Sequence, residues 1–319
     1  METTILLYSI IGSIGCSTNG FAIFILIHLK FTTTNRLILN QCIIDFLTSL
    51  MSLCLFLDEN ITTRLPESTL AADFICKIWS SKYFFWSSTF TSTANLVVLT
   101  FDRYFAVIYP LKYNIIKEKA ATKVILLLIP WLSGFGFIIL WLAAHTVEEG
   151  TCVQKWPSAA YQKMFGLLNG VYILVIPISV MIFVYFKIFR ALRSQVGEVS
   201  SVVSSTSAAR RLNIIKTMAI VSVTYVICWT PNQVAFINFT LGGEFDFDGP
   251  VYYVTVAMSL VNICINPVIY TFKYNDFKAG VRKTLPCLKK VFPIQEHVPL
   301  GSDTGNTAKS TVALNMDNN

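Results

Sequence analysis

The sequence has 319 residues, of which 54% are hydrophobic and 13% charged, and its mean hydropathy is +0.59. This composition is too apolar and too poor in charge for a soluble protein of this size, so we expect the chain to lie in a membrane. The net charge of +7 does not indicate nucleic-acid binding, because the basic residues gather on one side of the predicted membrane.

Seven hydrophobic runs are long enough to cross a bilayer, since a helix needs about 20 residues for roughly 30 Å of hydrocarbon. They lie near Ile5–Leu29, Leu37–Leu57, Trp79–Tyr109, Val124–Ala144, Phe165–Phe189, Ile214–Leu241 and Val251–Phe272. The first run is too long for a signal-peptide core and follows Glu2 rather than a basic segment, so we predict a true span. The predicted fold is an all-α membrane protein, a seven-helix transmembrane bundle.

The loops predict the orientation of the bundle, because cytoplasmic segments retain Lys and Arg. If the N-terminus is outside, most of the 25 Lys and Arg residues fall on the inner side, among them Lys112 and Arg190. The outer loops carry acids instead, such as Glu67 and Glu148. We therefore predict a multi-pass protein of the plasma membrane with its C-terminus in the cytoplasm.

One carboxylate falls in the middle of the second span. Asp45 lies about eight residues, or ~12 Å, from the inner end. At that depth a lone carboxylate costs ~3 kcal/mol or more unless it is protonated, paired or solvated. Counting along the third and last spans puts Ser92, Asn262 and Asn266 at a similar depth. The four residues are predicted to form one polar layer, and hydrogen bonds with water alone could satisfy it.

Two cysteines fall on the outer side, Cys76 before the third span and Cys152 in the loop after the fourth. Extracellular loops are assembled in an oxidising compartment, so this pair predicts a disulfide. The outer segment between the second and third spans contains Asn60-Ile61-Thr62, which makes Asn60 a candidate for glycosylation.

Several short motifs sit at defined places in the later spans. The third span ends on Asp102, Arg103 and Tyr104, and Pro110 follows. The others are Pro177 with Tyr185 in the fifth span, Cys228-Trp229-Thr230-Pro231 in the sixth, and Asn266-Pro267-Val268-Ile269-Tyr270 in the last. In this order and at these positions, the motifs resemble those of rhodopsin-like G-protein-coupled receptors, and the resemblance covers Asn19 to about Leu288.

The resemblance implies a receptor whose extracellular ligand biases two packings of the bundle, of which the inner-open one catalyses nucleotide exchange on a heterotrimeric G protein. The implied activation switch comprises Asp102, Arg103, Tyr104, Tyr185, Trp229, Pro231, Asn266, Pro267 and Tyr270. In the family the polar layer of Asp45, Ser92, Asn262 and Asn266 holds a sodium ion, an allosteric modulator. The family also has the Cys76–Cys152 disulfide.

Three features depart from the family pattern. Cys76 lies two residues further from Arg103 than is usual, which predicts an extra turn or bulge. Trp141 stands where the fourth span usually has a proline. The inner end of the sixth span reads Ala209-Arg210-Arg211-Leu212, where many members place an acid opposite the third-helix arginine. Arg103 would then face like charge, or the two arginines would extend toward lipid phosphates.

The third span has no acid between Cys76 and Asp102, and Phe85 stands about where an amine-binding aspartate would be. We therefore predict no aminergic ligand. Aromatic and amide side chains line the predicted ligand pocket, which comprises Lys82, Phe85, Trp86, Asn169, Asn232, Gln233, Phe236, Tyr252 and Tyr253. Under an acidic rim we favour a peptide ligand, with a lipid or another small molecule as the alternative.

After the last span, Phe277, Val281, Leu285 and Leu288 recur at helical spacing among basic residues. This pattern predicts a short amphipathic eighth helix on the inner leaflet, which completes a receptor domain of residues 1–288. Cys287 is a candidate for palmitoylation, and an unmodified cysteine is the alternative. The polar residues 289–319 are predicted to form a disordered cytoplasmic tail, whose hydroxyl groups are candidate sites for receptor kinases that recruit arrestin.

Two other classes of membrane protein share features with this sequence. A secondary transporter also places polar residues in the membrane, but we find no internal repeat. A retinal photoreceptor needs a Schiff-base lysine in the last span, and Val251–Phe272 contains none. The sequence shows no metal or nucleophile cluster, so we predict no enzymatic activity.

Overall fold

The computed structural model describes residues 2–57, 65–117, 119–195, 205–244, 246 and 249–288. The glycosylation candidate Asn60 and the predicted tail, residues 289–319, lie outside the described residues. The same holds for the side chains of Arg210, Arg211 and Leu288.

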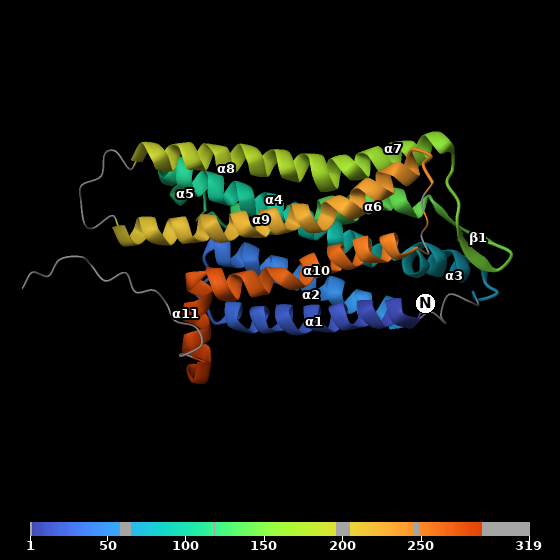
Figure 1. The fold of residues 1–319 in the computed structure, drawn as a ribbon, viewed down its shortest axis with the longest axis horizontal. Coiled ribbons are helices and arrows are strands. Elements are labelled where there is room, and N and C mark those ends of the chain that lie inside the picture. Colours follow the sequence, from blue (N-terminus) through green and yellow to red (C-terminus); the bar gives the residue numbers. More distant parts are fainter. Residues whose placement is uncertain are drawn as a thin grey trace, which may run out of the picture.

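Long helical segments run side by side along the length of the molecule (Figure 1). They are α1 (Glu2–Ile27), α2 (Thr33–Leu57), α4 (Tyr83–Ile108), α6 (Ala120–Leu142), the continuous segment of α7 (Ala159–Gly170), η3 (Val171–Val175) and α8 (Ile176–Gln195), α9 (Ser205–Thr240) and α10 (Pro250–Lys273). Each matches one of the seven predicted spans, so the predicted seven-helix bundle is confirmed.

Composition alone does not identify α4 as a membrane span, although it packs inside the bundle. In the described part of the chain, six segments are apolar enough to cross a membrane by composition alone, and α4 is not among them. Its buried residues include Ser87, Thr91, Thr93 and Asn95, and it packs against α2, α6, α8 and α9. The polar side chains of α4 therefore face other helices rather than lipid.

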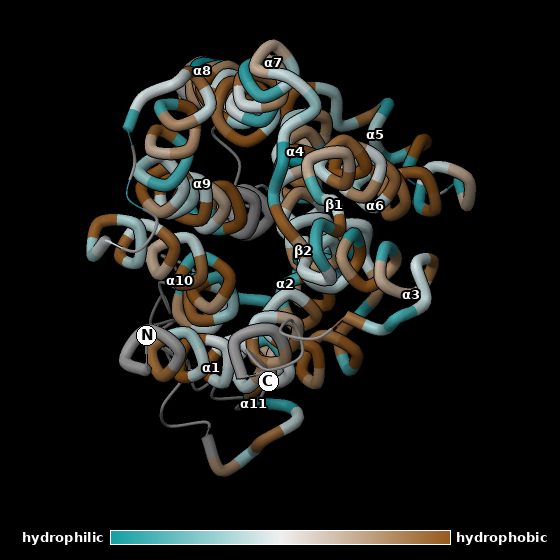
Figure 2. Tube along the Cα trace, turned by 90° about the vertical axis from the view of Figure 1, so that its right-hand side faces the viewer, coloured by the Kyte–Doolittle hydropathy of each residue, from teal (hydrophilic) through white to brown (hydrophobic). Residues whose placement is uncertain are grey.

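A β-hairpin lies across the outer end of the bundle, as the end-on view shows (Figure 2). Its strands are β1 (His145–Glu148) and β2 (Thr151–Gln154), paired antiparallel. The turn residues Glu149 and Gly150 have positive φ values of 50° and 75°, which suit a tight two-residue hairpin.

The predicted disulfide is confirmed. Cys152 of β2 bonds to Cys76 in η2 (Ile75–Ser80), and their Cα atoms are 5.2 Å apart. The π-helical η2 continues α3 (Thr69–Phe74), and the chain then breaks at Lys82, whose φ is 58°. The wider π-helical turn and the break at Lys82 accommodate the two additional residues that separate Cys76 from Arg103 in this chain.

At the inner end, α5 (Pro110–Ile116) follows α4, and α11 (Asn275–Thr284) runs across the end of the bundle (Figure 1). Phe277 and Val281 of α11 are fully buried, as the amphipathic pattern predicts. Leu285 is half-buried beyond the end of α11, and Cys287 is exposed in the short η5 (Pro286–Leu288).

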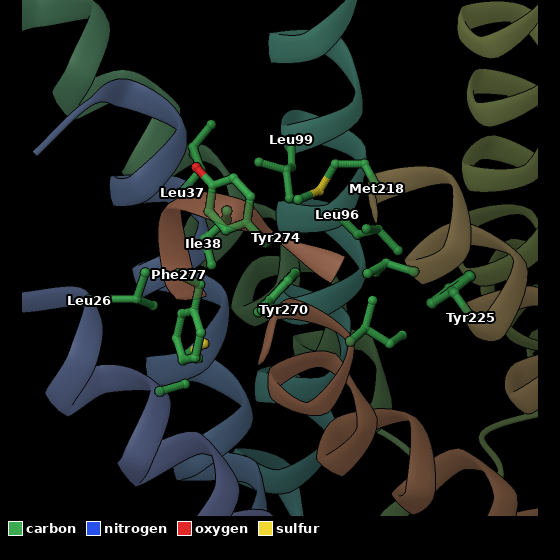
Figure 3. Close-up of a cluster of buried hydrophobic side chains, with 14 of the residues drawn as sticks. Leu26, Leu37, Ile38, Leu96, Leu99, Met218, Tyr225, Tyr270, Tyr274 and Phe277 are labelled. Atoms are coloured by element: carbon green, nitrogen blue, oxygen red, sulfur yellow. The ribbon is translucent and has the colours of Figure 1, made fainter. Parts of the chain in front are cut away.

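The main hydrophobic cluster joins several helices of the bundle (Figure 3). Leu96 and Leu99 of α4 belong to it together with Met218 and Tyr225 of α9. The inner half of α9 is packed against α4, and we call this arrangement closed.

The contact between α4 and α6 yields a stability prediction. A Cβ atom added at Gly134 of α6 would lie 2.5 Å from the backbone nitrogen of Thr91 and 2.8 Å from its Cα atom. Gly134→Ala would push the two helices apart, so we expect a loss of roughly 1–3 kcal/mol of stability and a melting temperature several degrees lower. Thermal unfolding of the purified protein measures this.

Gly136 provides a matched control on the same helix, because nothing lies within 4 Å of its added Cβ atom. Gly136→Ala should leave the melting temperature unchanged or raise it, since alanine is the better helix former. Equal loss in both variants would mean that close approach to Thr91 is not what requires Gly134.

Candidate functional site

A cavity of about 160 Å³ opens under the hairpin between α4, α6, α7, α9 and α10. Six predicted pocket residues line it: Trp86, Asn169, Asn232, Gln233, Phe236 and Tyr252. The lining also contains residues that the sequence analysis did not assign to the pocket, namely Phe90, Ile138, Trp141, Gln154, Phe165, Ala235 and Phe239. The outer half of the bundle thus has an aromatic and amide-lined cavity close to the predicted position.

Three predicted pocket residues lie elsewhere. Lys82 precedes the first turn of α4 in the left-handed conformation. Phe85 is buried one layer deeper, where it lines a much smaller void together with Trp229. Tyr253 offers its backbone carbonyl to the hydroxyl of Tyr8 on α1, at 3.4 Å. Lys82, Phe85 and Tyr253 therefore do not line this cavity, and their assignment to the ligand pocket stays a prediction.

Trp141 forms one wall of the cavity and connects it to the outer end of α4. Its indole nitrogen donates to the backbone carbonyl of Ser81 at 2.9 Å. Its ring lies 5.5 Å from that of Phe165 and 5.7 Å from that of Trp156, measured between centroids. The residue that replaces the family's proline therefore shapes the cavity.

The polar groups of the cavity are amides. Asn169, which is 5% exposed, donates through Nδ2 to Oε1 of Gln233 at 3.0 Å. The Oδ1 atom of Asn169 is buried without a hydrogen-bond partner. A buried acceptor left unpaired costs about 1–3 kcal/mol, which a donor on a ligand would recover. None of the residues lining the cavity carries a formal charge.

The polar layer forms around Asp45, which is fully buried. Ser92 donates to its Oδ1 at 2.7 Å, and Asn266 donates to its Oδ2 at 3.0 Å. Gln41, not assigned from the sequence, donates to both carboxylate oxygens at 3.1 Å. Asn262 was predicted to join this layer around Asp45, but its Oδ1 accepts from the indole of Trp229 at 3.3 Å instead.

The predicted switch at the inner end contains an ion pair between neighbours in the chain. Arg103 donates through Nε to Oδ2 of Asp102 at 3.1 Å, and both residues are buried. A second guanidinium nitrogen contacts Asp102 and the hydroxyl of Thr34 on α2. Tyr113 of α5 donates to the other carboxylate oxygen, Oδ1, at 2.7 Å. Asp102 thus holds Arg103 against α2 and α5.

Tyr113 is a permanent donor in this switch. Burial, together with the negative charge of Asp102, raises the pKa of Tyr113 above its usual value. The phenol therefore stays protonated at every physiological pH and keeps its hydrogen for Asp102.

The other predicted switch residues lie along α8, α9 and α10. Tyr185 bonds with Ser222 of α9 at 3.0 Å rather than with Arg103. Pro231 and Pro267 lie inside α9 and α10, where each removes a backbone hydrogen bond. Tyr270 is fully buried in the main hydrophobic cluster, with its hydroxyl unpartnered (Figure 3). Tyr104 turns outward and packs against Tyr109 and Phe183.

A second cavity, of about 230 Å³, lies beside Arg103 at the inner face. Ile214 and Ile215 of α9 form one side, and Tyr274 and Asp276 form another. A larger opening here requires the inner end of α9 to move away from α4.

Comparison with known proteins identifies the class. The sequence profile of the family described as 7 transmembrane receptor (rhodopsin family) matches residues 18–270. The chain therefore belongs to the rhodopsin family of seven-transmembrane receptors. As a member it is a multi-pass membrane receptor for an extracellular ligand that signals through a G protein, and its class is one of receptors rather than enzymes.

Individual relatives bind different kinds of ligand. Galanin receptor 2b of Danio rerio is 25% identical over 292 residues, which cover 88% of this chain and 74% of that receptor. The histamine H2 receptor of Homo sapiens is 25% identical over 202 residues, covering 61% and 56%. The QRFP-like peptide receptor of Branchiostoma floridae is 25% identical over 280 residues, covering 83% and 72%.

The inner switch yields a prediction for Tyr113→Phe. The variant removes the hydrogen bond to Asp102 and weakens its hold on Arg103 in the closed packing. A bond to a charged group contributes roughly 1.5–3 kcal/mol, and 1.4 kcal/mol is about tenfold in an equilibrium. We expect ligand-free signalling to rise several-fold to tenfold in a G-protein reporter assay at matched surface expression.

Tyr161 of α7 is the matched control, because its hydroxyl donates to the backbone carbonyl of Leu140 at the outer end of the bundle. Tyr161→Phe should leave basal signalling as it is. Unchanged signalling in Tyr113→Phe would show that the contact with Asp102 does not restrain the switch.

Proposed function

We propose that this receptor responds to a peptide. The observation that carries the proposal is the outer cavity, which is aromatic and amide-lined, has no charged lining residue and measures about 160 Å³. Pockets that enclose a whole small molecule are usually about 300–1,000 Å³. A cavity of this size suits one end or one side chain of a larger ligand, with the remainder outside.

The rim above the cavity supplies a second contact surface for a peptide. Gln154 of β2 reaches the cavity from the hairpin. The exposed acids Glu149, Glu244 and Asp246 lie in the outer loops. Negative potential at a binding site attracts cationic ligands and raises their association rate, so a basic peptide fits this rim better than an acidic one.

A small amine is the competing ligand class, because a histamine receptor is among the relatives. A membrane-embedded carboxylate is what an amine-binding cavity needs, and the cavity lining has none. Phe85 is buried at the corresponding position on α4. A lipid or another neutral small molecule remains the alternative within the same fold.

The remaining assignments are also proposals. The receptor would lie in the plasma membrane with its N-terminus outside, which places the hairpin and its disulfide in the oxidising compartment. Cys287 is exposed just beyond α11 and is accessible for palmitoylation. Receptor kinases and arrestin would act on the cytoplasmic tail.

The proposal is tested by applying a peptide panel to cells that carry the receptor and a G-protein reporter. Biogenic amines and lipids form the comparison arms. We expect a saturable response to a peptide and none to amines. An amine response that is lost in Phe85→Ala or Trp86→Ala would overturn the proposal, and a response to lipids alone would favour the alternative.

For the active peptide, Asn169→Ala should lower potency about tenfold, because it removes an amide that pairs with the ligand and with Gln233. Leu167→Ala, on the same helix but exposed outside the cavity, should leave potency unchanged. Concentration–response curves at matched surface expression measure both. Equal potency in the two variants would place the peptide elsewhere.

The inner end of α9 yields a prediction for basal signalling. Two cations ~6 Å apart at an effective dielectric constant of about 20 repel by roughly 3 kcal/mol before screening. Repulsion between Arg103 and Arg211 would favour separation of α4 and α9, so we expect measurable ligand-free signalling that Arg211→Glu reduces. Lys216→Glu makes the same charge change at an exposed site of α9 and should have less effect. Basal signalling equal to that of mock-transfected cells would rule out the repulsion.

A further inference from the structure

Gln41 lies one helical turn before Asp45 on α2 and occupies the middle of the polar layer. Its Nε2 group donates to both oxygens of Asp45 at 3.1 Å and also to the hydroxyl oxygen of Ser92. Ser92 in turn donates its own hydrogen to Asp45. The carboxamide is 2% exposed, so these bonds form away from solvent.

The rest of the Gln41 side chain is fixed by a chain of amides. Its Oε1 atom accepts from Nδ2 of Asn95 on α4 at 2.8 Å. Asn95 accepts through Oδ1 from Asn40 at 2.9 Å, and Asn40 accepts from the indole of Trp131 on α6 at 3.1 Å. Every polar group of Gln41 and Asn95 is paired, so the carboxamide has one orientation that satisfies the network.

This arrangement does not fit the sodium ion that the family resemblance implies. A hard cation takes oxygen ligands, and those of this layer are the oxygens of Asp45 and Ser92 and the Oδ1 of Asn266, which is buried without a partner. The oxygens of Asp45 and Ser92 already face N–H or O–H donors. Asn266 presents its Nδ2 group to Asp45, and the Oδ1 of Asn262 accepts from Trp229. An ion and the Gln41 amide would compete for the same lone pairs.

We propose that the Gln41 carboxamide takes the place of the cation at Asp45. The chain then supplies its own partner for the buried carboxylate, and sodium does not modulate the balance between the two packings of the bundle. An ion could enter only if Gln41 moved away, which would leave the Nδ2 group of Asn95 and the carboxamide of Gln41 without these partners in the interior. Each such group costs about 1–3 kcal/mol.

Thermal unfolding of the purified receptor tests this without any ligand, so the outcome is independent of the peptide proposal. The wild-type protein should melt at the same temperature in sodium chloride and in an equal concentration of potassium chloride. Gln41→Leu exposes Asp45 and Ser92 to an ion, so its melting temperature should rise by several degrees in sodium relative to potassium.

The control is Gln41→Leu combined with Asp45→Asn, in which the sodium effect should vanish because the carboxylate is gone. Gln41→Met, an unbranched side chain of similar length, replaces Gln41→Leu if the latter does not fold. Specific stabilisation of the wild-type protein by sodium would overturn the proposal. Sodium insensitivity of folded Gln41→Leu or Gln41→Met would also overturn it, because something other than Gln41 would then exclude the ion.

Discussion

The hydrocarbon of a bilayer offers no hydrogen-bond partner to a hydroxyl or an amide, and α4 carries such groups along much of its length. This helix has to be surrounded by the others, and α2, α6, α8 and α9 all pack against it. The polar layer at Asp45 follows from this arrangement, because Ser92 and Asn95 of α4 reach α2 there. The inner ion pair follows as well, since Asp102 and Arg103 end the same helix.

α4 also joins the two functional ends of the molecule. It has 26 residues and is therefore about 39 Å long. Its outer end continues from η2, which the disulfide ties to the hairpin above the cavity, and its inner end holds Arg103. The cavity wall is linked to this helix through the bond from Trp141 to Ser81. A ligand under the hairpin thus contacts elements that are connected to the switch residues by continuous helix.

Features that depend on distance along the chain were predictable, and those that depend on rotation or on loop placement were not. Hydrophobic length located the spans, and the two outer cysteines predicted the disulfide. Counting residues put Asn262 at the depth of Asp45, but the rotation of α10 turns it to Trp229. Gln154 reaches the cavity only because the hairpin folds over the bundle. No periodicity in the sequence predicts this placement of the hairpin. The contact of Gln41 with Asp45 was predictable, since Gln41 lies four residues before Asp45 and residues four apart share a helix face.

The amide network around Asp45 has a consequence for how this sequence can change over time. Gln41 and Asn95 have each donor matched to an acceptor on another residue. Replacing one member alone leaves its neighbour without a partner in the interior, whereas replacing two together can restore the match. Substitutions in this network are therefore tolerated in combination rather than one at a time. Among homologous receptors, Gln41, Asn95 and Asn40 should be conserved together or replaced together.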